Sequence, residues 1–560
     1  MFDHTAEIID IALARPELVI HNGDLPATAE ALRDVMAGSG QFFDRGVPVR
    51  IVRSVTDGSP AAIPLTRQHS VVISAHRLCR PIRLKQDGTR IDATLPDRVA
   101  QMYLDMVGEW NLRPLHGVTS APILFADGSV HTADRYDRDT GLFCSSIPKI
   151  TVPDRPTRGH AVASLAVLRQ TFRTFPFADA RRHWDGSIRA DVVDLTSVPG
   201  FDESNFLNAV LLAVCRPSLR LAPGYLVRAP EVSGAGTGKG LLIRSICMIA
   251  FGVIPPAFTM GGDRQELDKR LASELVEARP ALYLDNANGM ALRSDLLASA
   301  MTERPARIRV LGQTRMVALN SAAFIAIAGN GLTTSEDLVR RFLASELNAQ
   351  CEDPELRDLP RGFLAQIEEK RAELLAHVLT IWRWGRQNTG ALRQGRPLGS
   401  FETWGDWCRD PLLTLDCRDP VERIESLKSN DPRRQRIAEL FRLWWDNHGS
   451  SSIKANQLAE PVQATIDPQG RGRQYIATYL SRLSGTHAAG FVLTRQEPAG
   501  KWTAATYALT EVASTGPGRH RTHRTDRTED AAVTSGVGPM GPMPDPGGSD
   551  AVPPGGEAAI

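Results

Sequence analysis

Three apolar runs in the middle of the chain are continuous rather than alternating. They lie at 225–227, 281–284 and 322–328. Continuous runs are typical of parallel strands that are buried on both faces. Segments with helical spacing precede and separate them, at 160–175, 205–213, 241–249 and 264–276. This alternation predicts an α/β domain with a parallel sheet and a helical lead-in over residues 158–355.

Before this domain, the segments with a regular hydrophobic pattern are shorter and of mixed type. Pieces with helical spacing and strand-like pieces occur there, at 6–12, 27–36, 47–52 and 70–74. Asp127-Gly128 between apolar residues is a hairpin signal. We therefore expect an α+β module over residues 1–150, followed by a linker that contains prolines.

Three regions follow the α/β domain. Residues 356–425 predict a helical lid and connector, in which Trp382 and Trp384 continue an apolar stripe; we expect them in the core rather than stacked on bases. Residues 431–511 show three helical patterns and then a hairpin, an order that resembles a winged-helix domain. Residues 514–560 are rich in Gly, Pro, Ser and Thr and are expected to be disordered.

Composition narrows the classes of function. Lys and Arg number 65 against 64 Asp and Glu, so a basic surface for nucleic acid has to be local. The seven cysteines form no C-x-x-C pair, which argues against a zinc or disulfide framework. We find neither a signal-peptide pattern nor an apolar stretch of ~18 residues, and expect a soluble, cytoplasmic protein without a membrane partner.

A glycine-rich loop connects the first apolar run to a helical pattern. It reads Ser233-Gly234-Ala235-Gly236-Thr237-Gly238-Lys239-Gly240. Glycines allow backbone N–H groups to surround phosphate oxygens, the helix start adds positive potential, and the lysine adds a point charge. Residues 234–240 are therefore predicted to bind the phosphates of ATP. The alternative is a glycine-rich turn that carries an unrelated lysine.

The loop departs from the pattern G-x-x-x-x-G-K-[ST] at two positions. Ser233 stands where the first glycine is expected, and Gly240 stands where a hydroxyl residue would bind Mg²⁺. These departures bear on metal affinity and turnover more than on nucleotide binding.

Polar residues follow the other two apolar runs. Asp285 ends one run and Asn330 follows the other. Because ligands bind at the carboxyl ends of parallel strands, Asp285 is predicted to hold Mg²⁺ beside the loop, and Asn330 to orient the attacking water or contact the terminal phosphate. Asn286 stands where many such ATPases carry the glutamate that polarises the attacking water. The residues therefore predict nucleotide binding more strongly than nucleotide hydrolysis. The alternatives are an aspartate that only ends a strand and a plain Asn-Gly turn.

Arginines of the α/β domain are candidates for contacts with charged ligands. A predicted hairpin over 307–319 carries Arg307, Arg309 and Arg315 on its polar face, where they would bind DNA or a partner subunit. Arg340 and Arg341 are candidates for an arginine finger that reaches a neighbouring subunit's nucleotide. A local pair on a solvated helix is the alternative.

The winged-helix region carries a second set of basic residues. Arg471, Arg473 and Arg482 belong to its third helical pattern, and Arg495 and Lys501 to its hairpin. They are candidate phosphate contacts. A surface for protein contacts is the alternative.

The order of these parts resembles a known family. The loop, the Asp285 strand, the arginine hairpin, the Asn330 strand and the pair Arg340-Arg341 together resemble the superfamily 3 helicase domain of the phage and plasmid primase-helicase family. Segments upstream, such as 42–46 and 115–117, look like the region that precedes the ATPase in proteins of mobile elements. The resemblance covers about residues 30–350.

The resemblance implies an AAA+-like P-loop ATPase that uses ATP and Mg²⁺. It implies a homo-oligomeric ring, a hexamer being one form, with single-stranded DNA in the pore, duplex DNA at the winged helix, and a separate primase as a partner. The expected function is an ATP-dependent DNA helicase or translocase in the replication of a mobile genetic element. The rival is a nucleotide-gated DNA-binding protein with little turnover, for replication initiation or partition. A protein-remodelling ATPase is a third alternative.

Overall fold

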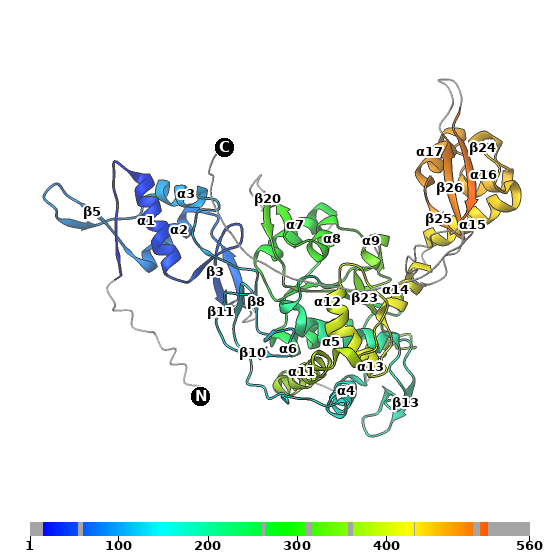
Figure 1. Ribbon diagram of the computed structural model, residues 1–560, viewed down its shortest axis with the longest axis horizontal. Helices are drawn as coiled ribbons and strands as arrows, with labels where there is room; N and C mark the ends of the chain where they lie inside the picture. Colours follow the sequence, from blue (N-terminus) through cyan, green and yellow to red (C-terminus); the bar gives the residue numbers. More distant parts are fainter. Residues whose placement is uncertain are drawn as a thin grey trace, which may run out of the picture. The chain divides into compact units, whose positions relative to one another are not determined.

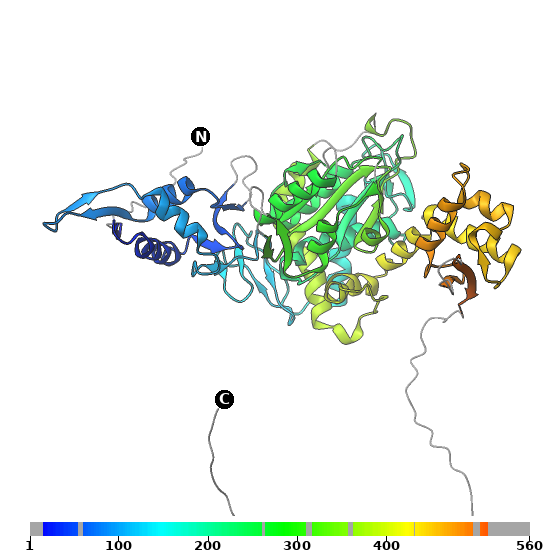
Figure 2. The ribbon, with the colours of Figure 1, turned by 90° about the horizontal axis from the view of Figure 1, so that it is seen from above.

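A five-stranded parallel sheet forms the centre of the first of two units, Met1–Arg436 and Ile437–Ile560. The structure is a computed structural model, and it describes residues 15–53, 60–259, 264–289, 291–309, 316–356, 362–429, 432–496 and 504–512. The strand order is β16 (Ala257–Phe258), β17 (Ala281–Leu284), β21 (Phe324–Asn330), β15 (Gly224–Ala229) and β23 (Phe342–Glu346). All neighbouring strands are parallel, and Figure 2 shows them side by side.

Helices cover both faces of this sheet. Tyr225 and Tyr283 face one hydrophobic core with α5 (Phe201–Cys215) and α6 (Lys239–Phe251). Their neighbours Leu226 and Leu282 face the opposite core with α7 (Arg264–Val276) and α8 (Asp295–Thr302) (Figure 1). Both faces of the strands are buried, which is why the apolar runs are continuous. The prediction of an α/β arrangement with a parallel sheet is confirmed.

A helical layer extends the core on the side of α5 and α6. It contains α4 (Arg158–Phe172), α10 (Phe363–Glu369), α11 (Arg371–Gln387), α12 (Glu402–Trp404), α13 (Asp410–Thr414) and α14 (Pro420–Ser429). Trp382 and Trp384 of α11 belong to this core and are 0% and 5% exposed. Their prediction as core residues rather than base-stacking residues is confirmed.

In the N-terminal part of this unit, residues 15–53 and 60–150 form short strands and three helices. Its elements are β1 (Glu17–Val19), α1 (Leu25–Gly38), β2 (Phe42–Asp44), β3 (Pro48–Arg53), β4 (Pro60–Pro64), α2 (Gln68–Leu78), β5 (Arg80–Leu84), β6 (Arg90–Asp92), α3 (Asp97–Asp105), β7 (Arg113–Pro114), β8 (Gly117–Thr119), β9 (Ile123–Leu124), β10 (Val130–His131), β11 (Tyr136–Asp137) and β12 (Leu142–Cys144). β9 and β10 pair antiparallel around Asp127-Gly128, as predicted.

One predicted strand in this part is wrong. Residues 70–74 lie in α2, although Val71, Val72 and Ile73 form a β-branched run. Val71 and Ala75 lie one helical turn apart and are both buried, so burial at helical spacing outweighed the local strand preference. The helix expected at 6–12 lies outside the described residues.

The N-terminal part shares its core with the α/β domain. Phe43, Val49 and Val118 pack in the same cluster as Leu271 of α7. The Arg45 side chain is buried and donates hydrogen bonds to backbone carbonyls of three segments, namely those of Leu115, His116, Leu275, Val276 and Asn320. The Arg45 guanidinium thus links the N-terminal part to the end of α7 and to the segment that precedes β21.

The described residues of the second unit form three helices and a four-stranded antiparallel sheet. Its elements are α15 (Pro432–His448), β24 (Ile453–Lys454), α16 (Glu460–Ile466), α17 (Arg473–Leu483), β25 (His487–Ala488), β26 (Phe491–Gln496) and β27 (Thr506–Glu511). The sheet order is β24-β27-β26-β25. Trp444, Leu480 and Leu493 are buried in its core. The expected order of three helices and a hairpin is present, and residues 513–560 lie outside the described ranges.

None of the helices in the described ranges combines the length and the apolar character that a membrane span requires.

Candidate functional site

The glycine-rich loop runs from the end of β15 to the start of α6. Gly236 and Gly238 adopt φ angles of 68° and 97°, which side-chain-bearing residues rarely adopt. The Thr237 hydroxyl is buried and donates to the Gly234 carbonyl at 2.9 Å, and Lys239 Nζ donates to the same carbonyl at 2.6 Å. These bonds join the two ends of the loop and hold its curvature.

Lys239 lies in a partly desolvated position beside a carboxylate. Burial lowers the pKa of its amine, and the opposite charge of Asp285 acts against this shift. The amine also lies 3.2 Å from Thr237 Oγ1. A cation is therefore held inside the loop and near the end of β17.

Asp285 lies next to the first turn of α6. A Cβ atom added at Gly240 would lie 3.9 Å from Asp285 Oδ2 and 3.0 Å from the hydroxyl oxygen of Tyr283. The other carboxylate oxygen, Oδ1, accepts a hydrogen bond from the Asn286 backbone at 2.9 Å. Asn286 is exposed and has a φ of 56°. The structure thus brings Asp285 to the loop, as the rule for strand ends predicts.

Tyr283 belongs to this site, although in the sequence it is only one residue of an apolar run. It is 0% exposed, and its hydroxyl has no hydrogen-bond partner among the described residues. Burial, and then the neighbouring Asp285, raise the pKa of the phenol, which therefore remains a neutral hydroxyl. Its only sequence signal is its position two residues before Asp285, on the same face of the strand.

Asn330 lies next to the first part of the loop, beside Gly234. It ends β21, which pairs with β15 so that Asn330 is opposite Ala229. A Cβ atom added at Gly234 would lie 2.6 Å from Asn330 Oδ1, and this oxygen is buried without a hydrogen-bond partner in the described part of the chain. Its backbone N–H donates to Asn288 Oδ1 at 2.7 Å. Asp285, Asn330 and Lys239 therefore converge at the carboxyl edge of the sheet.

The two adjacent arginines lie at the opposite edge. Arg341 directly precedes β23, and its carbonyl accepts from the N–H of Gly224, the first residue of β15. The length of β15, roughly 16 Å, separates this edge from the loop of the same chain. Arg341 Nη1 donates to the carbonyl of Ala298 in α8 at 2.5 Å, whereas the Arg340 side chain is exposed. Neither arginine can reach its own chain's loop from this position.

The predicted arginine hairpin is present as β19 (Ala306–Arg309) and β20 (Met316–Leu319). Ile308 and Val317 are buried, and Arg307 and Arg309 are exposed on the other face. Arg315 lies outside the described residues. Gly46 packs against the hairpin base, since a Cβ atom added there would lie 2.9 Å from Val317 Cβ. The hairpin therefore rests on the N-terminal part.

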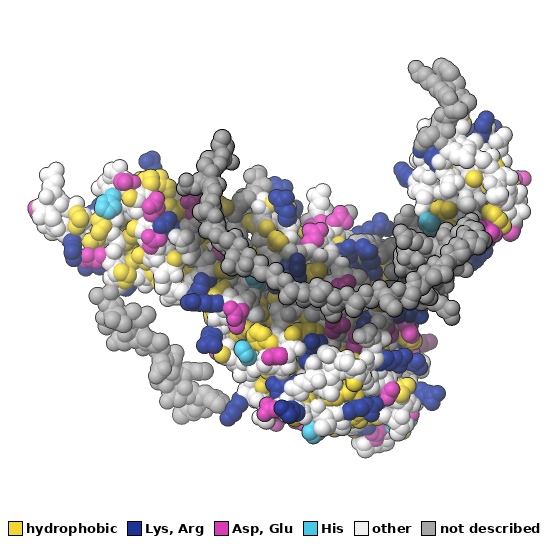
Figure 3. Space-filling view, viewed as in Figure 1, with side chains coloured by type: hydrophobic (Ala, Val, Ile, Leu, Met, Phe, Trp, Pro, Cys, Tyr) yellow, Lys and Arg dark blue, Asp and Glu magenta, His cyan; other side chains and the backbone are white. Residues whose placement is uncertain are grey.

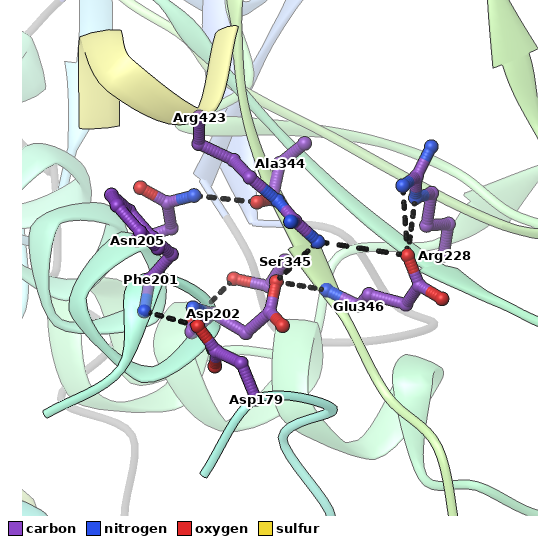
Figure 4. A network of polar contacts seen from close by, with 9 residues as sticks. All are labelled: Asp179, Phe201, Asp202, Asn205, Arg228, Ala344, Ser345, Glu346 and Arg423. Carbon is purple, nitrogen blue, oxygen red and sulfur yellow. Dashed lines mark hydrogen bonds and ion pairs between the residues drawn. The ribbon is translucent and has the colours of Figure 1, made fainter. Parts of the chain in front are cut away.

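A buried polar network lies at the same sheet edge as the loop, on β23 (Figure 4). Asp202 Oδ1 accepts from the backbone N–H of Glu346 at 2.9 Å and lies 3.4 Å from Arg423 Nη2 of α14. The Glu346 carboxylate pairs with Arg228 of β15 at 2.7 Å. Burial, then the nearby Asp179 carboxylate, raise the pKa of Asp202 to about 7, against the opposing charge of Arg423.

The second unit carries a basic groove of about 690 Å³ between α17 and the hairpin strands. Its charged lining residues are all cationic: Lys454, Arg473, Arg482 and Arg495. Arg471 is placed differently, because it lies 3.6 Å from Asp467 and covers the Tyr475 ring at 3.9 Å. Lys501 lies outside the described residues. On the face of the first unit in Figure 3, Lys and Arg side chains are instead interspersed with Asp and Glu.

No protein-family model and no curated protein matches the sequence. Among solved structures, the chain is similar to an apo structure of the C-terminal region, residues 305–718, of NrS-1, at 12% identity and a TM-score of 0.35, over 86% of this chain and 99% of that one. It is also similar to Cch of SCCmec type IV, described as an active helicase, at 10% identity and a TM-score of 0.27, over 84% and 97%. TM-scores this low support no conclusion about function. Function is therefore inferred from the residues of the site.

Proposed function

We propose that the loop over 233–240 is a P-loop that binds ATP and that the first unit is a P-loop ATPase. The observation that carries this proposal is the convergence of Lys239, Asp285 and Asn330 around a glycine loop at the carboxyl edge of a parallel sheet. Two buried polar atoms without partners, Tyr283 Oη and Asn330 Oδ1, face this loop. The Tyr283 hydroxyl can donate to a phosphate oxygen, and Asn330 Oδ1 can accept from a water of a hydrated metal ion or from the attacking water, so the residues present fit the ligand.

Each residue has a distinct role in this proposal. The loop N–H groups and Lys239 bind the phosphates, Asp285 holds Mg²⁺, and Asn330 contacts the terminal phosphate or the attacking water. Bound Mg²⁺ would neutralise charge on the phosphate oxygens. Asn286 cannot act as a base, so the chain's own contribution is to position the nucleotide and the attacking water.

The finer proposal is an ATP-dependent DNA helicase or translocase of the superfamily 3 type, from a mobile element's replication machinery. Because Arg340 is exposed at the sheet edge away from its own chain's loop, it is the proposed arginine finger on the nucleotide of a neighbouring subunit in a head-to-tail ring. Arg341 is better explained as a structural link to α8. The exposed Arg307 and Arg309 are the proposed pore contacts with single-stranded DNA.

The second unit is proposed to be a winged helix that binds duplex DNA. The cationic groove beside α17 supports this assignment, because phosphates are the part of DNA that arginines and lysines bind irrespective of sequence. A separate primase as a partner remains a prediction from the resemblance alone.

The test is steady-state ATP hydrolysis with Mg²⁺, with and without single-stranded DNA, for the wild type, Lys239→Ala and the control Lys370→Ala. We expect DNA-stimulated turnover in the wild type and the control, and its loss in Lys239→Ala. Binding of ATP with no turnover above that of Lys239→Ala would favour a nucleotide-gated DNA-binding protein. Absence of ATP binding in the wild type would overturn the P-loop assignment.

A further inference from the structure

The hydroxyl that is missing from the glycine loop has a counterpart on β17 of the same sheet. Gly240 replaces the Ser or Thr that follows the P-loop lysine and normally binds Mg²⁺. The Tyr283 hydroxyl lies 3.0 Å from the place where a Cβ atom of residue 240 would stand, and Asp285 Oδ2 lies 3.9 Å from it. A hydroxyl is therefore present at the start of α6, but it belongs to a residue of β17.

The Tyr283 hydroxyl differs from other buried hydroxyls of this unit in its position beside Gly240 and Asp285. The side chain is 0% exposed and its Oη atom has no hydrogen-bond partner among the residues that the structure describes. An unpaired buried hydroxyl is unfavourable, and phenylalanine would fill the same space without that penalty. The atom is directed at the loop and at Asp285, so a ligand bound there would pair it.

The need for glycine at position 240 comes from the space that the Tyr283 side chain occupies, and not from the backbone conformation. Gly236 and Gly238 need positive φ angles, whereas Gly240 lies within the first turn of α6 and has none. Glycine is unfavourable inside a helix compared with other small residues. A side chain at 240 would press on the Tyr283 hydroxyl at 3.0 Å, closer than ordinary van der Waals contact. The two residues thus form one arrangement, in which glycine makes room for the phenol.

We propose that the Tyr283 hydroxyl replaces the missing hydroxyl of residue 240 as a positioning group that hydrogen-bonds Asp285 and the hydrated Mg²⁺ of bound ATP. The proposal rests on the ATP site proposed above. It makes Tyr283 and Gly240 interdependent: serine at 240 is compatible with phenylalanine at 283 but crowds tyrosine.

The test measures ATP binding by isothermal titration calorimetry at a series of Mg²⁺ concentrations, and without Mg²⁺. Variants of the full chain are Tyr283→Phe, Gly240→Ser and the double variant. Tyr225→Phe is the matched control, because Tyr225 is also 0% exposed, has a hydroxyl without a hydrogen-bond partner among the described residues, and lies in the same core on β15, which β21 separates from β17. Lys239→Ala reports on the ATP site itself.

We expect Tyr283→Phe to weaken Mg²⁺-dependent ATP binding about tenfold, the size of one hydrogen bond to a charged group, and to leave metal-free binding within about twofold. Gly240→Ser should lose at least as much, and the double variant should recover to within about threefold of the wild type. Tyr225→Phe should bind like the wild type.

Equal Mg²⁺ dependence in the wild type and Tyr283→Phe would overturn the proposal while leaving the ATP site intact, provided Lys239→Ala still loses binding. A double variant no better than either single variant would also overturn it. If the wild type binds no ATP, the proposed function fails instead, and the two failures are thereby distinguished.

Discussion

Asp202 gives the most quantitative prediction about the stability of the first unit. Its carboxyl is 0% exposed, and its pKa is raised from 3.8 to about 7, mainly by burial and next by Asp179. A native state that binds the proton more tightly than the unfolded chain loses stability as pH rises through the window between these values. Ionisation of Asp202 therefore lowers the free energy of unfolding progressively between about pH 4 and pH 7, and this penalty is fully present above about pH 7.

The substitution Asp202→Asn should remove this penalty. Asparagine retains an Oδ1 acceptor for the Glu346 N–H and behaves as the neutral acid does at every pH. A difference of about three pKa units corresponds to about 4 kcal/mol. This difference already includes the opposing charge of Arg423, so we expect Asp202→Asn to be about 4 kcal/mol more stable than the wild type at pH 8 and only about 1–2 kcal/mol more stable at pH 5.

Urea unfolding followed by tryptophan fluorescence at pH 5, 6, 7 and 8 measures the difference. Asp194→Asn is the control: hydrogen bonds from Thr196 and Ser197 lower the pKa of Asp194 to about 2, so its contribution is constant across this range. The Asp194 variant should therefore be displaced by the same amount at every pH. If the stability of Asp202→Asn runs parallel to that of the wild type from pH 5 to pH 8, Asp202 is ionised in the native state and the reasoning is refuted.

Two further predictions concern buried and exposed arginines. Arg45→Met should destabilise the first unit by about 3–5 kcal/mol, because five backbone carbonyls lose their donor inside the core. Thermal unfolding measures it, and Arg83→Met, at an exposed position of β5, is the control. A loss below about 1 kcal/mol would mean that water replaces the guanidinium. Arg482→Ala should weaken duplex DNA binding and reduce the salt slope by about 1, whereas Arg471→Ala should do less, since Arg471 already contacts Asp467 and Tyr475. Fluorescence anisotropy at several salt concentrations measures both, and equal effects would contradict the placement of Arg471 outside the groove.

The order of elements in the α/β domain and the second unit could be predicted because burial leaves a local signal. Strands covered on both faces read as continuous apolar runs, and helices read as a 3.6-residue period. The convergence of Asp285 and Asn330 followed from a general rule about strand ends, without any knowledge of distances. Their roles, the domain limits and the ring remain predictions.

The parts that escaped prediction depend on contacts between distant segments. Tyr283 reads as one more apolar residue of a buried strand, and only its distance from Gly240 distinguishes it. Arg45 reads as a turn residue, although its acceptors lie up to 275 positions away in the chain. The grouping of Asp202 with Arg423 has the same cause, since α5 and α14 meet only in the folded chain. Sequence periodicity reports that a residue is buried, and not which groups meet it there.

The arginine link between the N-terminal part and the α/β domain has a consequence for how this protein can be rearranged by recombination. A break near residue 150 would separate Arg45 from its acceptors on Leu275, Val276 and Asn320, and would expose the apolar face that Phe43 and Val118 cover. Exchange of either part alone for a homologous one would then require a matching partner surface. The two segments are therefore expected to be inherited together, whereas the second unit, with a core of its own, can be exchanged by itself.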